Sequence, residues 1–227
     1  MTLNFPNFPV DIPVRPAAEH AATPAAGLYR RRIKRAFDTL AVLAAAPVIL
    51  PVVAALALAV RRDGGGAFYS QPRVGRGGQI FRIWKLRTMV PDAEARLARL
   101  LAEDPAARRE WQETQKLRQD PRVTPLGRIL RRTSLDELPQ LWNVLLGDMS
   151  LVGPRPMMPD QQAMYPGTAY YRLRPGITGA WQVSARNQST FAARAQFDAD
   201  YDRDLSLMTD LRLLGRTVGA VLRGTGC

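Results

Sequence analysis

Two adjacent carboxylates, Asp136 and Glu137, are the side chains in this sequence best suited to chemistry. A carboxylate nucleophile beside a carboxylate that can bind a metal suits phosphoryl transfer when basic side chains surround the pair. That reaction mainly requires neutralisation of the charge on the phosphate oxygens. The arginines closest to the pair in the sequence are Arg128, Arg131, Arg132 and Arg155. We therefore take Asp136 and Glu137 as the candidate catalytic residues.

The local pattern around this pair allows two interpretations. Ser134 and Glu137 have the spacing of a capping box, in which the serine caps a helix and the glutamate reaches back to it. Pro139 argues against that start, because its ring would meet the carbonyl of Leu135 beyond the first turn. A helix that begins nearer Asp136 keeps Pro139 in its first turn and places both carboxylates beside N–H groups that favour phosphate. The spacing favours the capping box, and Pro139 favours the later start.

Composition excludes several other mechanisms. The chain of 227 residues has 32 Lys and Arg against 20 Asp and Glu, a net charge of +12, with His20 and Cys227 as its single histidine and cysteine. A Ser–His–Asp or Cys–His hydrolase therefore lacks a plausible base, and a zinc site lacks ligands. The positive charge predicts acidic partners, such as the phosphates of a nucleotide, a lipid or a nucleic acid.

An uncharged segment, residues 39–60, predicts contact with a membrane. Its length would cross a bilayer, which takes about 20 apolar residues, but Pro47 and Pro51 lie at its centre and each half is too short to cross alone. Basic residues flank both sides, so the positive-inside rule keeps both ends on the cytoplasmic face. We expect a re-entrant helix. A kinked single span and a buried helix of a soluble protein remain the alternatives.

The rest of the chain indicates a mixed fold with three parts. Two apolar runs, 67–74 and 79–86, flank a glycine-rich turn and predict a β-hairpin. Residues 91–116 predict two helices divided at Pro105, and the last 35 residues predict one amphipathic helix, whereas 153–156 and 174–179 indicate a turn and a loop. We expect a disordered tail (1–28), the re-entrant helix with basic flanks (29–62) and a catalytic domain on the cytoplasmic face (63–227). The fold class is α+β and membrane-associated, with a Pro-broken re-entrant membrane helix, amphipathic surface helices and a short β-hairpin.

From about residue 29 to its end, the sequence resembles the bacterial sugar transferase family, the monotopic polyprenyl-phosphate phosphoglycosyl transferases. The stretches that carry the resemblance occur in this order: KRAFD, QPRVGRGGQIFRIWKLRTM, DPRVTPLGRILRRTSLDELPQLWNVLLGDMSLVGPRP and RPGITGAWQVSARN. The end of the chain and the WQVS segment resemble the branch that initiates exopolysaccharide synthesis with galactosyl or glucosyl phosphate. Ala185 departs from the glycine that this branch commonly has.

The resemblance implies a reaction with a covalent intermediate. Asp136 would attack the β-phosphate of a UDP-sugar, expected to be a hexose, and release UMP. Polyprenyl (undecaprenyl) phosphate would then accept the sugar phosphate from Asp136. Glu137, together with Asp136, would hold Mg²⁺.

The resemblance also implies binding roles for basic residues. Substrate or phosphate binding is implied for Arg155 in Pro-Arg-Pro, Arg131 at the lipid phosphate, Lys85, Arg87 and Arg186. It further implies a re-entrant helix broken at Pro47.

The partners expected from this resemblance are a UDP-sugar, polyprenyl phosphate and the lipid bilayer, with no nucleic acid. The location would be the cytoplasmic face of the bacterial inner membrane, at the first membrane step of exopolysaccharide or related glycan synthesis. The identity of the sugar, the length of the lipid and self-association as a homo-oligomer are left open. The alternative is a basic peripheral membrane or nucleic-acid-binding protein without catalysis, which would bind phosphates in a salt-sensitive way and tolerate loss of Asp136.

Overall fold

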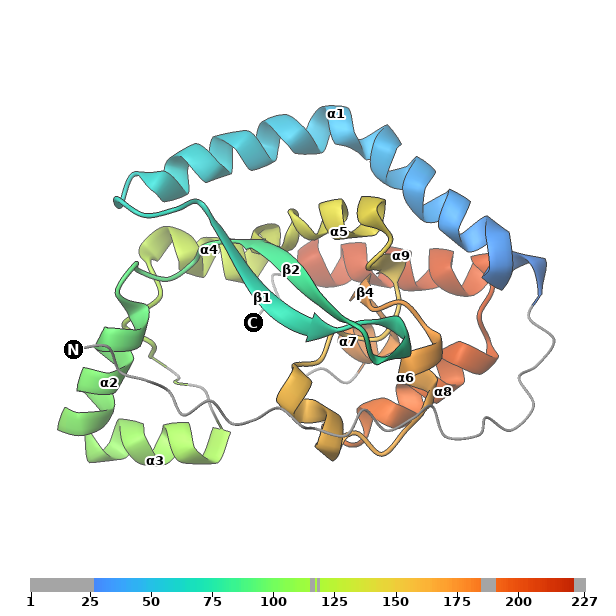
Figure 1. Cartoon of the computed structure of the whole chain (residues 1–227). Coiled ribbons are helices and arrows are strands. Elements are labelled where there is room, and N and C mark those ends of the chain that lie inside the picture. Colours follow the sequence, from blue (N-terminus) through green and yellow to red (C-terminus); the bar gives the residue numbers. More distant parts are fainter. Residues whose placement is uncertain (1–26, 115–116, 118, 185–190, 223–227) are drawn as a thin grey trace.

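The computed structural model describes residues 27–114, 117, 119–184 and 191–222. The predicted tail lies almost entirely outside these residues, and Arg186 lies outside them too. A π-helical turn, η1 (Tyr29–Ile33), leads into the long helix α1 (Lys34–Arg61), and the rest of the described chain lies on one side of it (Figure 1).

The elements that follow α1 are short and mostly helical. In chain order they are β1 (Phe68–Val74), η2 (Arg76–Gly78), β2 (Ile80–Leu86), α2 (Ala93–Glu103), α3 (Pro105–Thr114), α4 (Pro125–Thr133), η3 (Leu135–Glu137), α5 (Gln140–Leu146), β3 (Ser150–Val152), η4 (Pro159–Met164), α6 (Ala169–Arg172), β4 (Gly176–Thr178), α7 (Ala180–Ser184), α8 (Arg194–Arg203) and α9 (Leu207–Leu222). The predicted division of the 91–116 region at Pro105 is confirmed, since α2 ends at Glu103 and α3 begins at Pro105.

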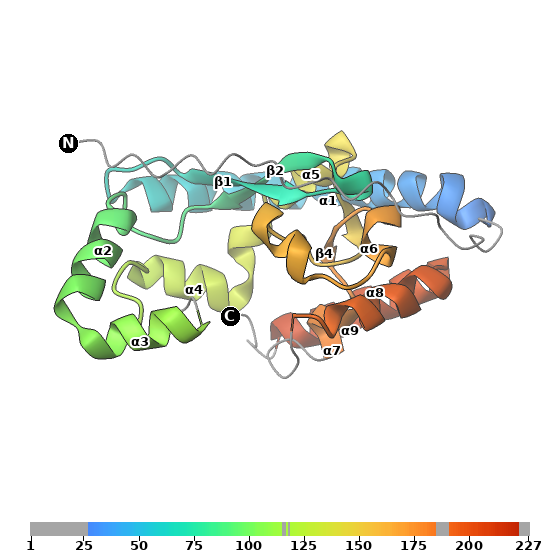
Figure 2. The same cartoon turned by 60° about the horizontal axis from the view of Figure 1, so that its bottom comes forward.

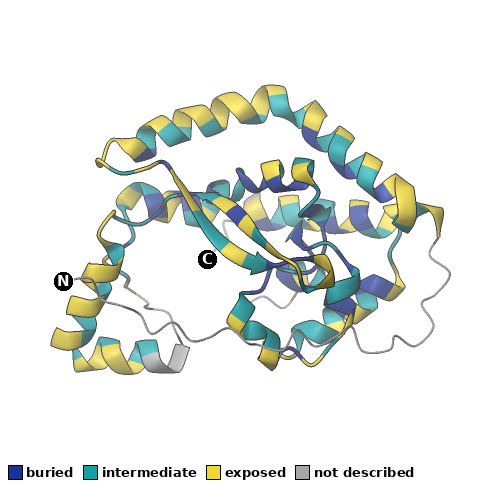
Figure 3. Ribbon diagram, viewed as in Figure 1, coloured by how far each residue is buried: buried dark blue, intermediate teal, exposed yellow. Residues whose placement is uncertain are grey.

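Helix α1 is apolar, exposed and bent. Within the described residues, Tyr29–Arg61 is the segment long and apolar enough to cross a membrane, and little of it is buried (Figure 3). Helical structure continues through Pro47 and Pro51, so Pro47 does not end the helix, and the re-entrant path stays a prediction. A proline removes one hydrogen bond and kinks a helix, while the turns on either side can continue. Figure 1 accordingly shows α1 changing direction near its middle.

The predicted β-hairpin is confirmed. Strands β1 and β2 pair antiparallel, with Phe68 opposite Leu86 and Val74 opposite Ile80. The turn closes through a bond from the Gly75 N–H to the Gln79 carbonyl, and Gly77 takes a left-handed conformation there. Figure 2 shows α1 and the hairpin in one layer, with α2, α3, α4, α8 and α9 all to one side of it.

A second, parallel pair of strands was not predicted: β3 directly precedes the predicted turn at 153–156, and β4 lies within the predicted loop at 174–179. Strands β3 and β4 pair Ser150 with Gly176 and Val152 with Thr178. Just beyond, the Gly153 N–H donates to the Thr178 carbonyl and the Gly176 N–H to the Pro154 carbonyl. A Cβ on Gly176 would overlap the backbone of Gly153, so this close approach of two backbones requires glycine. Strands of three residues carry too little alternation to be predicted from sequence.

The predicted single C-terminal helix is two helices, α8 and α9. Ser206 begins the second helix, because its Oγ accepts the Thr209 N–H at 3.2 Å and its carbonyl accepts the Asp210 N–H. Serine is a preferred N-cap residue, and the amphipathic pattern concealed this signal.

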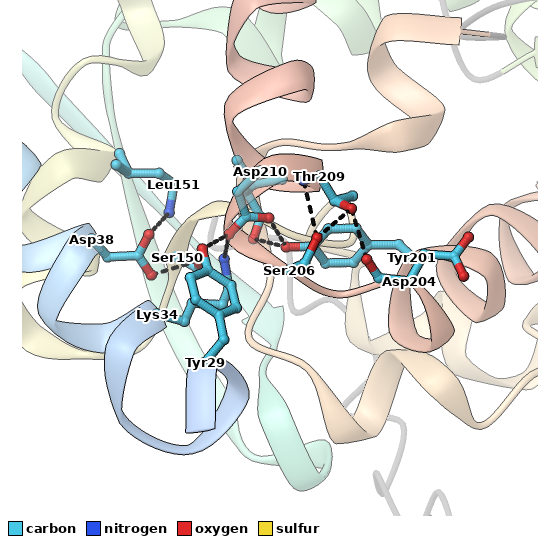
Figure 4. A network of polar contacts seen from close by, with 11 residues as sticks. Tyr29, Lys34, Asp38, Ser150, Leu151, Tyr201, Asp204, Ser206, Thr209 and Asp210 are labelled. Carbon is cyan, nitrogen blue, oxygen red and sulfur yellow. Dashed lines mark hydrogen bonds and ion pairs between the residues drawn. The ribbon is translucent and has the colours of Figure 1, made fainter. Parts of the chain in front are cut away.

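A buried polar network joins the start of α1 to the other end of the chain (Figure 4). Fully buried Asp210 on α9 pairs with the Lys34 ammonium at 2.7 Å and accepts the hydroxyls of Tyr29 and Tyr201, each at 2.6 Å. One helical turn along α1, Asp38 accepts the Ser150 hydroxyl at 2.6 Å. The network therefore fixes α1 against β3, α8 and α9.

Candidate active site

An apolar cluster positions the candidate catalytic residues at the far end of α1. Its members come from α1, β2, α4 and η3, and they are Val60, Leu86 and Leu130, with Leu135 packed against them. Lys85, Arg131 and Asp136 are each the chain neighbour of one of these leucines. Packing of the leucines thus brings one lysine, one arginine and one aspartate to the same region. We call Val60, Leu86, Leu130 and Leu135 the apical cluster.

The carboxylate pair lies in a single 3₁₀ turn between two α-helices. Ser134 ends α4 in a left-handed conformation, with φ of 58°, and its side chain makes no capping bond. Helix α5 begins only at Gln140, after Pro139. Both sequence interpretations are therefore wrong in detail: the capping box is not formed, and the pair does not start an α-helix. The Glu137 side chain binds Lys85 instead of reaching back to Ser134.

Lys85 joins the two carboxylates. Its Nζ lies 2.6 Å from Glu137 Oε1 and 4.0 Å from Asp136 Oδ2. Burial tends to raise the pKa of Glu137, but the charges of Lys85 and Arg155 and the hydrogen bonds from Lys85 and Gln140 hold this pKa below its ordinary value. Glu137 is therefore an ionised carboxylate with a fixed counter-charge.

Asp136 has a different environment from its neighbour. Burial raises the pKa of this carboxyl to about 6, against the opposing charge of Lys85. Among the described residues, no other residue donates a hydrogen bond to it, although the other buried aspartates all have such donors. These are Asp38, Asp198, Asp202 and Asp210. Asp136 is thus a buried carboxyl whose oxygens are available to a substrate or a metal ion.

Two of the four nearby arginines reach this region. Arg131 donates from Nε to the Thr88 hydroxyl at 2.9 Å, and its charge favours the ionised form of Asp136. The charge of Arg155, from the loop after β3, acts on Glu137. Arg128 and Arg132 are exposed on α4 instead.

Other predicted residues lie elsewhere. Arg87 donates to the carbonyls of Gly66, Met89 and Val60 and pairs with Asp63, so it fastens the end of α1 to the end of β2. None of these contacts involves the carboxylate pair. Pro47 lies within α1, far along the helix from Val60, and Arg186 is outside the described residues.

Asn143 is a positioning residue that the sequence did not reveal. Almost fully buried on α5, it accepts the Trp84 N–H at 3.1 Å and donates to the Arg82 carbonyl at 2.8 Å. It therefore pairs with the free edge of β2 beside Lys85. The available signal was a polar residue among the apolar positions of a predicted helix.

The carboxylate pair matches the ligands that Mg²⁺ prefers. The described residues hold no group of three or more acidic, histidine or cysteine side chains that could bind a metal by themselves. Mg²⁺ commonly takes one or two carboxylates and completes its shell with substrate phosphates and water. Ionised Glu137 and the available oxygens of Asp136 fit that pattern.

Known proteins resemble this chain over most of its length. A sequence profile described as bacterial sugar transferase matches residues 29–224. The chain is 45% identical to UDP-galactose-lipid carrier transferase of Erwinia amylovora and 46% identical to undecaprenyl-phosphate galactose phosphotransferase of Salmonella typhimurium. Each alignment covers 86% of this chain and 42% of the relative, so the chain spans less than half the length of these two proteins.

A shorter relative aligns over nearly its whole length. The chain is 41% identical to exopolysaccharide production protein ExoY of Sinorhizobium fredii, over 93% of each protein. Because the profile covers nearly all of the described residues, this chain belongs to the bacterial sugar transferase family.

Proposed function

We propose that this chain transfers a sugar 1-phosphate, with a hexose as the sugar, from a UDP-sugar to polyprenyl phosphate and releases UMP. The relatives' names support both substrates, since one names UDP-galactose and a lipid carrier, and another names undecaprenyl phosphate and galactose. A third is named for exopolysaccharide production, which supports a place at the first membrane step of exopolysaccharide or related glycan synthesis.

The observation that carries this proposal is the environment of Asp136. A buried carboxyl without hydrogen-bond donors from other residues is costly to the fold, and such groups are typical of functional sites. With a pKa of about 6, Asp136 is mostly ionised at neutral pH and free to act as a nucleophile. Glu137 is held by Lys85 and is the poorer nucleophile.

The reaction proceeds in two displacements at one phosphorus atom. An Asp136 oxygen forms a bond to the β-phosphorus of the donor, the bond to the bridging oxygen breaks, and UMP leaves with that electron pair. The sugar phosphate is then joined to Asp136 as an acyl phosphate, a mixed anhydride. A phosphate oxygen of polyprenyl phosphate attacks the same phosphorus, releases the Asp136 carboxylate and forms polyprenyl diphospho-sugar. A carboxylate needs no base to activate it, so the scarcity of histidine is no obstacle.

Basic residues have distinct roles in this proposal. Lys85 lies beside both carboxylates and offsets the charge that gathers when the donor diphosphate approaches them. Arg131 lies next to the apical cluster at the end of α1 and would meet the lipid phosphate. Arg155 would meet a phosphate of the nucleotide, and Arg87 keeps its structural contacts.

We also propose that Mg²⁺ binds at Glu137 and Asp136. When bound, the ion would neutralise charge on the donor diphosphate. Removal of divalent ions with EDTA should abolish UMP release, and added Mg²⁺ should restore it. Full activity in EDTA would contradict this assignment.

The membrane helix is proposed to enter and leave by the cytoplasmic face of the inner membrane. The exposed apolar surface of α1, its central bend and its basic flanks support this topology. In a Cys227→Ser background, Gly27→Cys and Gly66→Cys place thiols at the two ends of α1, where a new Cβ meets no close neighbour. An impermeant maleimide should label both in inverted vesicles and neither in intact spheroplasts. Labelling from opposite sides would indicate a spanning helix.

The catalytic proposal is tested by replacing the nucleophile. Full-length protein is incubated with polyprenyl phosphate and a panel of UDP-sugars, UMP is measured, and the preferred donor identifies the sugar. Asp136→Asn should not release UMP. It should also lack the sugar-phosphate adduct that mass spectrometry is expected to show on the wild-type protein when the UDP-sugar is present and polyprenyl phosphate is left out. Asp204→Asn, a change at an exposed ion pair, is the matched control. UMP release by Asp136→Asn near the wild-type rate would show that Asp136 is not the nucleophile.

A further inference from the structure

Three arginines from distant parts of the chain lie near one another and near Glu137. They are Arg73 at the end of β1, Arg155 in the loop after β3, and Arg194 at the start of α8, and we call them the arginine cluster. The charge of Arg155 acts on Glu137 and on both other arginines, so it connects the cluster to the carboxylate pair.

A second apolar cluster fixes these arginines in place. Its buried members are Val74, Met157, Tyr165 and Tyr170, and Phe191 and Ala195 pack against them. Arg73 precedes Val74 and Arg194 precedes Ala195 in the chain. The Val74 N–H donates to the Met157 carbonyl at 3.0 Å, which joins β1 directly to the loop that carries Arg155.

The arginine donors are only partly used. Arg73 donates to the Gln71 side chain at 2.7 Å and to the Pro156 carbonyl at 3.4 Å, yet its buried Nε has no acceptor. The Arg194 guanidinium lies over the rings of Trp181, at 4.1 Å, and Phe191, at 4.6 Å. Among the described residues, nothing accepts a hydrogen bond from Arg194 or Arg155, and the Arg194 Nε is also buried.

The positive charges of the arginine cluster oppose one another. Burial and then the charge of Arg155 lower the pKa of Arg194 to about 10, although the Asp198 charge acts in the other direction. The same two causes lower the pKa of Arg73 against the charge of Glu137. A guanidinium held flat against aromatic rings keeps its N–H edge available for a planar or phosphate acceptor. Guanidinium groups with unused donors, held in fixed positions, are the expected features of a site for a multiply charged anion.

The geometry points to the arginine cluster as the site that binds the 5′-phosphate of the donor nucleotide and of the leaving UMP. This inference rests on the proposed function, and it adds Arg73 and Arg194 to the residues that recognise the donor. Lys85 pairs with Tyr69 across the hairpin. Arg73 lies four residues beyond Tyr69 on the same face of β1, about 13 Å from it at 3.3 Å per residue. Lys85 lies beside Asp136, and the charge of Arg155 acts on both Glu137 and Arg73, so positive charge extends from Asp136 towards Arg73.

Position also separates this site from a lipid-phosphate site. The apical cluster beside Arg131 contains Val60 of α1, whereas the apolar cluster behind the three arginines contains no residue of α1. A phosphate attached to a membrane lipid would approach beside α1, and a soluble nucleotide can approach from the other side. We therefore assign the arginine cluster to the nucleotide.

The test measures binding of UMP and uridine to the full-length protein by calorimetry. Arg194→Gln should weaken UMP binding by about ten-fold or more, because one charge-assisted hydrogen bond to phosphate is worth at least that factor. Uridine carries no phosphate, so its affinity should not change. Arg203→Gln removes an exposed arginine of the same helix and should leave both affinities as in the wild type.

Kinetics distinguish the two phosphates. Arg194→Gln should raise the KM for the UDP-sugar and leave the KM for polyprenyl phosphate unchanged. A rise only in the KM for the lipid, unchanged UMP affinity, or an equal loss of uridine affinity would overturn the assignment. If Arg194→Gln does not fold, Arg194→Lys serves, because it keeps the charge and loses the flat fork. The affinity of Arg194→Lys for UMP should lie between that of the wild type and that expected for Arg194→Gln. Wild-type affinity in Arg194→Lys would count against the assignment.

The outcome is separable from that of the catalytic proposal. In EDTA, where no Mg²⁺ contributes, Asp136→Asn should bind UMP no more weakly than the wild type, because the arginine cluster is intact in that variant. Failure of the nucleophile assignment appears as UMP release by Asp136→Asn, whereas failure of this inference appears as unchanged UMP binding by Arg194→Gln.

Discussion

Replacing Asp210 by Asn should destabilise the protein by about 3–5 kcal/mol, the usual cost of breaking a buried ion pair. Asp210 is fully buried, and Lys34, 2.7 Å away, keeps only 11% of its side chain exposed. Asn cannot neutralise the ammonium, and it offers one acceptor oxygen to two tyrosine hydroxyls. Lys34 would therefore lose its ion-pair partner in a buried position and keep only the weaker attraction of Asp38.

The reverse replacement should cost less. In Lys34→Met, Asp210 keeps the two tyrosine hydroxyls as donors, each now at 2.6 Å. We expect a loss of about 1–3 kcal/mol, in the range for a buried charge that retains hydrogen bonds. The double variant should be more stable than the sum of the two losses predicts, because neither member of the Lys34–Asp210 pair is left without the other; the loss of the Lys34 charge near Asp38 is the same in both Lys34 variants.

Thermal unfolding of the full-length protein in detergent measures these differences. A loss of about 3–5 kcal/mol corresponds to a fall in Tm of roughly 10 °C for a chain of this size. Asp204→Asn is the control, since Asp204 is more than half exposed and its change should stay within about 0.5 kcal/mol. Additive losses in the double variant, or equal losses in the two single variants, would refute the reasoning.

Three further predictions concern the site itself. Asp136→Asn should stabilise the metal-free protein in EDTA: the folded-state pKa of about 6 lies above 3.8, so ionisation of this carboxyl opposes folding at high pH. The gain should be about 2–3 kcal/mol at pH 8 and vanish near pH 4 in chemical denaturation, and a pH-independent gain would count against the pKa. Asn143→Ala should lower stability by about 2 kcal/mol and slow UMP release, because the Trp84 N–H loses its buried acceptor; unchanged turnover would remove Asn143 from the positioning residues. Gly127→Ala should destabilise by about 2 kcal/mol or more, since its Cβ would overlap the Thr88 carbonyl, and an unchanged Tm would show that α4 can shift.

Some parts of the fold were predictable because their signals are local. The hairpin follows from two apolar runs around a glycine turn, and Pro105 alone divides α2 from α3. The carboxylate turn was not predictable in detail. Glu137 fits a capping box with Ser134, but its partner is Lys85, 52 residues earlier in the chain. A buried charge pair outweighs a capping preference, and spacing within one segment carries no information about such a partner.

The reactive residues of the candidate site could be predicted from the sequence, but only some of the basic residues around them could. Asp136 and Glu137 could be identified as the reactive pair from adjacent carboxylates and nearby arginines. Arg128 and Arg132, equally close in sequence, are exposed, whereas Arg73 and Arg194 reach the site from distant segments. Burial decides which arginines share the site, and burial is a property of the tertiary fold.

The apical cluster sets the height of the reaction above the membrane. Val60, near the end of α1, packs with leucines that are chain neighbours of Lys85, Arg131 and Asp136. In the proposed topology, the depth at which α1 rests in the lipid therefore determines how far Asp136 stands from the plane of the headgroups. One extra helical turn before Val60 would move that distance by about 5 Å, more than a bond-forming approach allows. A lipid-linked phosphate diffuses only within that plane, so the position of α1 holds Asp136 at the same height as the phosphate of the acceptor.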